Sequence, residues 1–278
     1  MSVARKLRTL FFIAKRRPAQ AWELLQIRAE RKVGVSLFFL SARRSITHAF
    51  EALRTKKVST ELRQYGNYFL AAAAIPPHPV VFSLGVGQDI SFDRALMDRH
   101  EVRLFLFDPT PASKRFIDGL DLPSNVRFFP LAIADHDGTV AIFSDDLEKD
   151  LQRTSSISIF NRGFYESAGS VQCKKISTLM TEHGLAHLDI LKLDIEGAAI
   201  QVLEDLLREG IFPTQVACEF ERPEKMTEVY AYLRRLGALF DKFEAAGYEL
   251  FRTRQTDKGC QIEVLAIRRS TPQSSASV

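Results

Sequence analysis

Three charged side chains stand at the end of one apolar run in the middle of the chain. The stretch Leu188–Gly197 reads LDILKLDIEG, and it places Lys192, Asp194 and Glu196 directly before a helical pattern. An apolar run followed by a helix predicts a buried parallel strand. Charges just past such a strand lie at its carboxyl end, where open α/β sheets bind ligands. We therefore expect these three side chains at the mouth of a binding site.

Carboxylates in that position could do acid–base chemistry. Asp194 and Glu196 are candidates for a general base, together with Glu219 and Glu221 at the end of the next predicted strand. Two carboxylates close together raise the pKa of one of them, which makes it a better base. Because side chains alternate along a strand, Lys192 and Asp194 should share a face. Lys192 could then tune that base or bind an acidic group, or it could form a structural ion pair with Asp194 or Glu219.

A glycine turn follows an earlier predicted strand, Val80–Leu84. Gly85 and Gly87 permit a tight turn and a close approach of the backbone to a ligand. The dinucleotide pattern requires a third glycine where Ile90 stands. Asp89 also puts a negative charge where a pyrophosphate would lie. Both features disfavour NAD and favour S-adenosylmethionine (SAM), which carries no phosphate and has a cationic amino group and sulfonium.

Acids at the ends of the next two predicted strands complete a candidate cofactor site. Asp108 follows the strand Val102–Phe107, about twenty residues after the glycine turn, where an acid binds the ribose hydroxyls of an adenosine cofactor. Capping of the following helix is the alternative. Ala132 and Asp135 end the third strand, whose edge would frame the adenine. Asp135 could accept from the adenine amino group, but a turn shared with Gly138 is the commoner use of such an acid.

The order of predicted elements indicates an α/β fold. Strands alternate with helices after residue 78, which predicts a doubly wound, Rossmann-like, mostly parallel sheet. Tyr248–Arg252 and Gln261–Arg268 are strands joined by a short loop, so one strand near the C-terminus should be antiparallel, as in the methyltransferase variant of this fold. We expect one domain over residues 78–268 and a Ser-rich, disordered tail over residues 269–278.

Residues 1–77 are expected to form a basic, helical N-terminal extension that ends at the proline cluster Pro76–Pro79. Residues 1–57 hold fourteen Lys and Arg against three acids, although the whole chain has a net charge of only +4. A basic amphipathic segment suits an anionic membrane surface. Packing on the domain or on a second subunit, which would make an oligomer, is an equal alternative, and a transit peptide is a third. No nucleic acid is expected, because aromatic and basic residues do not interleave.

Composition also limits the class of protein and the compartment in which we expect it. The chain has 278 residues, 46% of them hydrophobic, which is enough for a full core. Cys173, Cys218 and Cys260 are far apart and lack metal-ligand spacing, so we predict no metal site and a reducing compartment. No apolar run reaches the roughly 18 residues of a membrane span, and no signal peptide is convincing. We expect a cytoplasmic protein, peripheral at a membrane if the extension binds lipid.

Several of these motifs together resemble the FkbM-type SAM-dependent methyltransferases. They are the glycine turn, the strand end at Asp108, the segment Ala132–Gly138 and the segment Leu191–Ala198 with its leucine-rich helix. The resemblance covers roughly residues 78–268 as one domain. It implies SAM as the cofactor and O-methylation of a sugar or macrolide hydroxyl. On this basis the expected acceptor is a sugar, a glycolipid or a polysaccharide.

Two departures place the chain in a divergent branch of that family. Ser83 stands where the first strand often carries an acid, and Ala199 stands where a second glutamate often follows the glycine. Methyl transfer is mainly a positioning problem, and a general base helps a sugar hydroxyl to attack. Asp194 and Glu196 would face the acceptor, or Asp194 would bind the amino group of SAM. A NAD-linked oxidoreductase and a non-catalytic, membrane-recruited scaffold with the same fold are the rival interpretations.

Overall fold

The computed structural model describes residues 56–57, 62–144, 166–195, 197–221, 226–255 and 261–269. Several predicted features lie outside these residues: most of the basic extension, Glu196 and the tail from residue 270. Within the described part, no helix combines the length and the apolar character that a membrane crossing requires.

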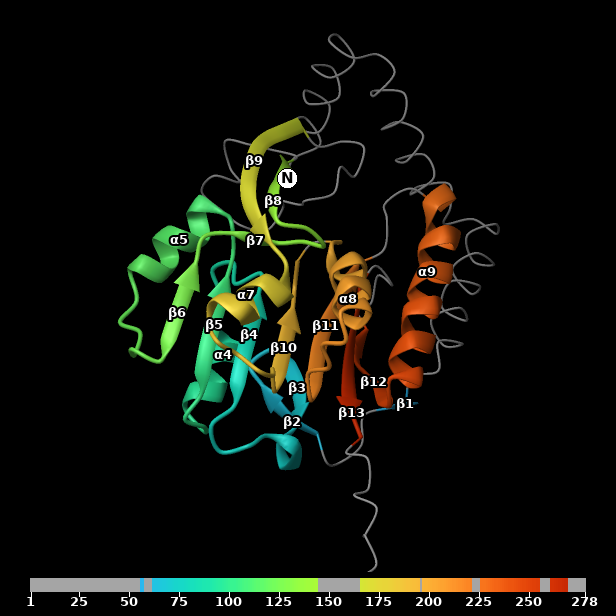
Figure 1. Cartoon of the computed structure of the whole chain (residues 1–278), viewed down its shortest axis with the longest axis horizontal. Coiled ribbons are helices and arrows are strands. Elements are labelled where there is room, and N and C mark those ends of the chain that lie inside the picture. Colours follow the sequence, from blue (N-terminus) through green and yellow to red (C-terminus); the bar gives the residue numbers. More distant parts are fainter. Residues whose placement is uncertain are drawn as a thin grey trace, which may run out of the picture.

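An eight-stranded sheet forms the centre of the fold (Figure 1), in the order β1-β12-β13-β11-β10-β4-β5-β6. Its strands are β1 (Lys56–Lys57), β4 (Val80–Leu84), β5 (Arg103–Phe107), β6 (Val126–Phe129), β10 (Ile190–Leu193), β11 (Gln215–Glu221), β12 (Tyr248–Gln255) and β13 (Gln261–Arg268). Every pair is parallel except the two pairs that contain β13. The predicted Rossmann-like sheet with an antiparallel strand near the C-terminus is confirmed.

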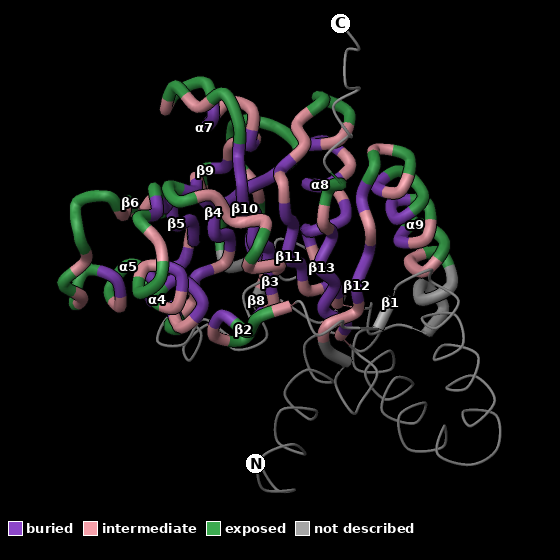
Figure 2. Tube along the Cα trace, turned by 90° about the horizontal axis from the view of Figure 1, so that it is seen from below, coloured by how far each residue is buried: buried purple, intermediate pink, exposed green. Residues whose placement is uncertain are grey.

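Helices and a hairpin cover the two faces of this sheet (Figures 1 and 2). One face is covered by α7 (Ile176–Glu182), α8 (Ala199–Arg208) and α9 (Met226–Ala245). The other is covered by α4 (Ser91–Met97), α5 (Pro111–Asp118) and the antiparallel hairpin of β2 (Leu62–Tyr65) and β3 (Tyr68–Ala71), which a 3-10 helix, η1 (Ala72–Ala74), follows. The central strands are therefore buried on both sides, which explains their nearly continuous apolar sequence.

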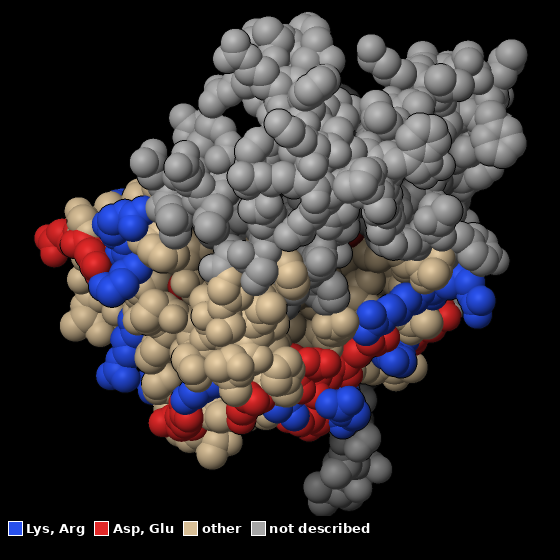
Figure 3. Space-filling model, turned by 90° about the horizontal axis from the view of Figure 1, so that it is seen from above, with Lys and Arg blue, Asp and Glu red and all other residues tan. Residues whose placement is uncertain are grey.

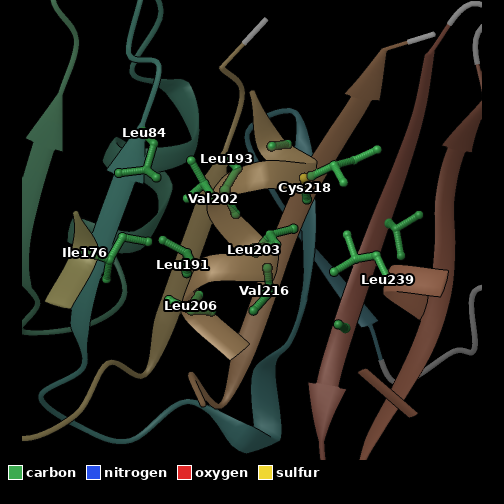
Figure 4. Close-up of a cluster of buried hydrophobic side chains, with 14 of the residues drawn as sticks. Leu84, Ile176, Leu191, Leu193, Val202, Leu203, Leu206, Val216, Cys218 and Leu239 are labelled. Carbon is green, nitrogen blue, oxygen red and sulfur yellow. The ribbon is translucent and has the colours of Figure 1, made fainter. Parts of the chain in front are cut away.

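Helix α8 shows how the sequence produces this packing. Val202, Leu203 and Leu206 recur at helical spacing, and they point at the side chains of β10 and β11 (Figure 4). Leu191 and Leu193 of β10 meet them from the sheet, and all five side chains are at most 2% exposed. This apolar contact holds the helix that follows β10 close to the strand end that carries the predicted acids.

A smaller sheet stands beyond the carboxyl ends of the main one (Figure 1). Its order is β7-β9-β8, with β7 (Ala132–Ile133), β8 (Gly138–Ser144) and β9 (Glu166–Lys174). The prediction of a single third strand that ends at Ala132 and Asp135 is wrong, because the chain divides there into β6 and β7. Pro130 lies between them and has no N–H to donate to a ladder, so the chain leaves one sheet and enters the other.

The expectation of a helical extension over residues 1–77 is wrong over residues 62–71. These residues form the β2–β3 hairpin, whose two-residue turn is Gly66-Asn67, and Gly66 adopts a positive φ of 55°. Gly-Asn is a hairpin signal when it joins two short runs. Tyr65, Tyr68 and Leu70 are buried and pack in the same apolar cluster as α4 and the central strands. The domain boundary at the proline cluster stays a prediction.

Candidate functional site

A cavity of about 260 Å³ opens where β4, β5 and β10 end. Most of the predicted site residues lie in its wall: Gly85, Gly87, Asp89, Asp108, Ala132, Lys192 and Asp194. The strand ends meet there because parallel strands all present their carboxyl ends at one edge. Glu219 and Asp135 are not among the lining residues, and Glu196 lies outside the described residues.

Gly85 brings the end of β4 against the end of β10. Its φ is +75°, and its N–H donates to the carbonyl oxygen of Phe107 over 2.9 Å. A Cβ atom at this position would lie 1.7 Å from the carbonyl oxygen of Asp194. Only glycine fits both the conformation and the space. The turn therefore lets three strand ends converge on one cavity.

Asp108 holds the turn together through its carboxylate, and its side chain is almost fully buried. Its Oδ2 accepts from the Gly87 N–H over 2.9 Å, and its Oδ1 accepts from the N–H and the hydroxyl of Thr110 over 2.8 and 2.6 Å. Thr110, and not Asp108, caps α5, because its hydroxyl accepts from the N–H of Ser113. Each carboxylate oxygen offers two acceptor positions, so Oδ2 keeps one for a hydroxyl in the cavity.

Lys192 is a buried lysine in the middle of the sheet, 5% exposed. Its Nζ donates to the carbonyl oxygen of Gly85 over 2.8 Å and lies 3.5 Å from Oδ2 of Asp194. The same ammonium lies 5.4 Å from the centre of the Tyr68 ring, a cation–π distance. The predicted ion pair between Lys192 and Asp194 is thus present, and the lysine supports the glycine turn as well.

Glu219 of β11 is on the same face of the sheet as Lys192 of β10. It stands one strand away from the cavity wall. It is half-buried and lies opposite Glu263 of β13. Burial raises the pKa of Glu219 to about 8, and the carboxylates of Asp194, Glu221 and Glu263 raise this pKa too. A pKa in this range favours the protonated carboxylic acid at neutral pH.

Asp135 lies away from the cavity, so its predicted contact with an adenine has no support here. Its Oδ1 bonds Nδ1 of His136 over 2.9 Å, and that hydrogen bond lowers the pKa of Asp135 and raises the pKa of His136. Nε2 of His136 lies 3.7 Å from Sγ of Cys173. Asp135 lies instead in the turn before β8, which was the alternative prediction for this residue.

Sequence reasoning missed the residues that the hairpin contributes. Asn67 and Tyr68 line the cavity, and Nδ2 of Asn67 donates to Oδ2 of Asp89 over 3.0 Å. Oδ1 of Asp89 accepts from the N–H of Ser91 over 2.8 Å. Asp89 thus joins the hairpin to the start of α4, a use that its sequence position did not suggest. The Gly-Asn turn was the one signal that could have placed a hairpin here.

Comparisons with known proteins agree on the class. Residues 41–250 match the family model of the methyltransferase FkbM domain. The 2-O-methyltransferase NoeI of Sinorhizobium fredii (strain NBRC 101917 / NGR234) is 26% identical over 138 residues, which are 46% of this chain and 57% of NoeI. The chain therefore spans little more than half the length of that relative.

Among solved structures, Aeropyrum pernix fibrillarin in complex with natively bound SAM is 12% identical, with a TM-score of 0.38 over 70% of this chain and 68% of fibrillarin. A putative rRNA methylase from Clostridium thermocellum is 11% identical, with a TM-score of 0.39 over 70% of this chain and 89% of the methylase.

Proposed function

Since the chain belongs to the FkbM methyltransferase family, whose members are SAM-dependent, we propose that it methylates a hydroxyl group of a sugar, a glycolipid or a polysaccharide. The observation that carries the proposal is the cavity in which Gly85, Asp108 and Asp194 converge from three strands. The relative NoeI is a 2-O-methyltransferase, which supports an oxygen as the acceptor atom.

The residues of the cavity fit SAM on the cofactor side. Asp108 keeps one acceptor position on Oδ2 for a ribose hydroxyl, and Gly85 lets the end of β4 lie against the backbone of Asp194 beside it. Ala132 and Ile133 supply an apolar wall that suits an adenine ring. Asp89 is committed to Asn67 and Ser91, so it contributes to the cofactor site chiefly by holding the turn.

When bound, SAM supplies an electrophilic methyl group, which passes to the acceptor oxygen as its bond to sulfur breaks. The chain must align the acceptor and remove the hydroxyl proton. Asp194 lines the cavity and its side chain is 39% exposed, so it is placed to accept that proton. Lys192 positions Asp194 through the 3.5 Å ion pair. The pKa of Glu219 favours its protonated form at neutral pH and this residue lies outside the wall, so it is the weaker candidate for the base.

Calorimetric titration with S-adenosylhomocysteine (SAH) and with NAD tests the cofactor. SAH should bind the wild type, and Gly85→Ala should lose this binding because the new Cβ would meet the backbone of Asp194. Gly119→Ala is the matched control, since Gly119 has a φ of −84° and its Cβ would make only ordinary contacts at 3.5 Å or more. Binding of NAD in place of SAH would overturn the proposal.

Transfer from labelled SAM to glycolipids, polysaccharides and free sugars tests the acceptor. The proposal predicts label on a carbohydrate hydroxyl with the wild type and a loss of at least tenfold with Asp194→Asn, as expected when a general base is removed. Asp118→Asn serves as the control, because Asp118 is an exposed acid on α5 that pairs with Lys114. SAH binding without transfer to any acceptor would instead favour a non-catalytic scaffold.

A further inference from the structure

Tyr68 lies in the wall of the cavity and carries a buried hydroxyl. Its side chain lines the cavity wall and is only 5% exposed, yet its hydroxyl has no hydrogen-bond partner among the described atoms. Buried tyrosine hydroxyls are normally paired, because an unpaired one loses its hydrogen bond to water without compensation. A hydroxyl of this kind in a ligand cavity points to a partner that the ligand supplies.

The surroundings of that hydroxyl are carboxylates. Burial raises the pKa of Tyr68, and the charges of Asp194, Glu219 and Glu263 raise this pKa further, so the phenol keeps its proton and can donate. Lys192 faces the Tyr68 ring, and its ammonium is already bonded to the Gly85 carbonyl. The Tyr68 hydroxyl is therefore a hydrogen-bond donor that is surrounded by carboxyl groups.

The β2–β3 hairpin holds Tyr68 at this place from both ends. At the turn, Asn67 bonds Asp89. At the other end, the side chain of Gln215 accepts from the N–H of Ala71 over 2.8 Å and donates to its carbonyl oxygen over 3.1 Å. The Tyr68 ring also packs edge-on against Phe92, with 5.6 Å between the ring centres. Such fixed geometry is what an orienting hydrogen bond to a substrate requires.

We propose that Tyr68 and Asp194 together form the acceptor subsite, in which the Tyr68 hydroxyl orients a sugar, and that this subsite selects neutral or cationic sugars over anionic ones. The inference rests on the proposed function, because it names the acceptor class of the same site. Selection follows from charge, since an acceptor that carries its own carboxylate would be brought next to the carboxylate of Asp194, which lines the cavity. Tyr68 acts here as a substrate-binding residue and not as the base.

Ligand-detected NMR on the SAH-loaded full chain tests this subsite with three sugars: methyl glucoside, glucosamine and glucuronic acid. The first two should bind the wild type more tightly than glucuronic acid does. Tyr68→Phe should weaken the affinity for methyl glucoside by about three- to tenfold, which is the effect of one lost hydrogen bond. The affinity for SAH should stay unchanged within twofold. Tyr65→Phe is the matched control, because Tyr65 lies on the same hairpin and its hydroxyl bonds Nε2 of His100.

Three results would overturn the inference: equal sugar affinity in Tyr68→Phe and the wild type, tighter binding of glucuronic acid than of glucosamine, or no binding of any of the three sugars. Each of these is read on protein that binds SAH. A wild type that fails to bind SAH would count against the proposed function itself, so the two failures are distinguishable.

Discussion

Among single residues, Lys192 is a charge that contacts three parts of the site. A lysine in the middle of a buried strand would be costly without partners. Here the ammonium bonds the carbonyl of Gly85, pairs with Asp194 and faces the ring of Tyr68. The residue therefore connects the cofactor turn, the proposed base and the proposed acceptor subsite, which makes it a positioning residue for all three.

Glu219 should make stability depend on pH. In the folded chain its pKa is about 8, against an ordinary value of 4.5, so the folded state binds more protons between these values. Stability from this group should therefore fall as pH rises through that window. Urea unfolding at pH 5 and pH 8.5 should show Glu219→Gln gaining stability relative to the wild type as pH rises.

Glu182→Gln is the control for this experiment, because Glu182 is more exposed and pairs with Lys174 at the surface. Parallel stability curves for the wild type and Glu219→Gln across the two pH values would contradict the assignment.

At the scale of elements, the β2–β3 hairpin depends on one glycine. A Cβ atom on Gly66 would lie 2.3 Å from the backbone nitrogen of Phe92, and its φ of +55° disfavours other residues. Gly66→Ala should therefore push the hairpin away from α4. We expect a loss of about 2 kcal/mol or more in the free energy of unfolding, measured by urea denaturation.

Gly210→Ala separates the clash from the backbone strain. Gly210 also has a positive φ, +71°, but no atom of the described residues lies within 4 Å of its Cβ position. Gly66→Ala should cost more than this control does, and it should also weaken sugar binding through Tyr68. Equal costs for the two variants would show that the close approach to α4 contributes little.

The sequence could predict the elements whose signal is local. The apolar runs of β4, β5 and β10 and the residues that end them were found, and Gly85, Asp108 and Asp194 do meet at one cavity. The contribution of Tyr68 could not be found in this way. It depends on a hairpin that docks against strands far away in the chain, and the only local signal for that hairpin is the Gly-Asn turn.

Two other residues show the same limit of local signals. Glu219 lies near the end of β11, as predicted, but it is not among the residues that line the cavity. Asp135 has the residue type and the register of an adenine contact, yet a hydrogen bond to the next residue, His136, decides its orientation. Spacing along the chain predicts which strand end carries a residue, and packing decides what that residue faces.

At the scale of the whole molecule, charge divides the chain into two parts. On the described part, acidic and basic side chains lie beside one another (Figure 3), and many are paired, such as Arg235 with Glu204. Residues 1–57 instead carry a strong excess of Lys and Arg. We keep the proposal that this segment binds an anionic surface, with binding to a second subunit as the alternative.

A deletion that stops at residue 55 tests the proposal, since Lys56 and Lys57 form strand β1 and pair with β12. Binding to vesicles that contain phosphatidylserine should be lost and SAH affinity retained, and binding of the full chain should weaken as salt is raised. Equal vesicle binding by the deletion would contradict the membrane role, and a change in mass by light scattering would favour the second subunit.

The two hydrogen bonds between Ala71 and the side chain of Gln215 matter for folding during synthesis, because they join the hairpin to a strand that is made much later. The two residues are 144 positions apart, so the hairpin leaves the ribosome long before its partner strand exists. At about 5–20 residues per second, the interval is roughly 7–30 s. During that time Tyr65, Tyr68 and Leu70, all buried in the finished fold, have no sheet to cover them. We therefore expect this hairpin to be a place where a chaperone can bind the nascent chain.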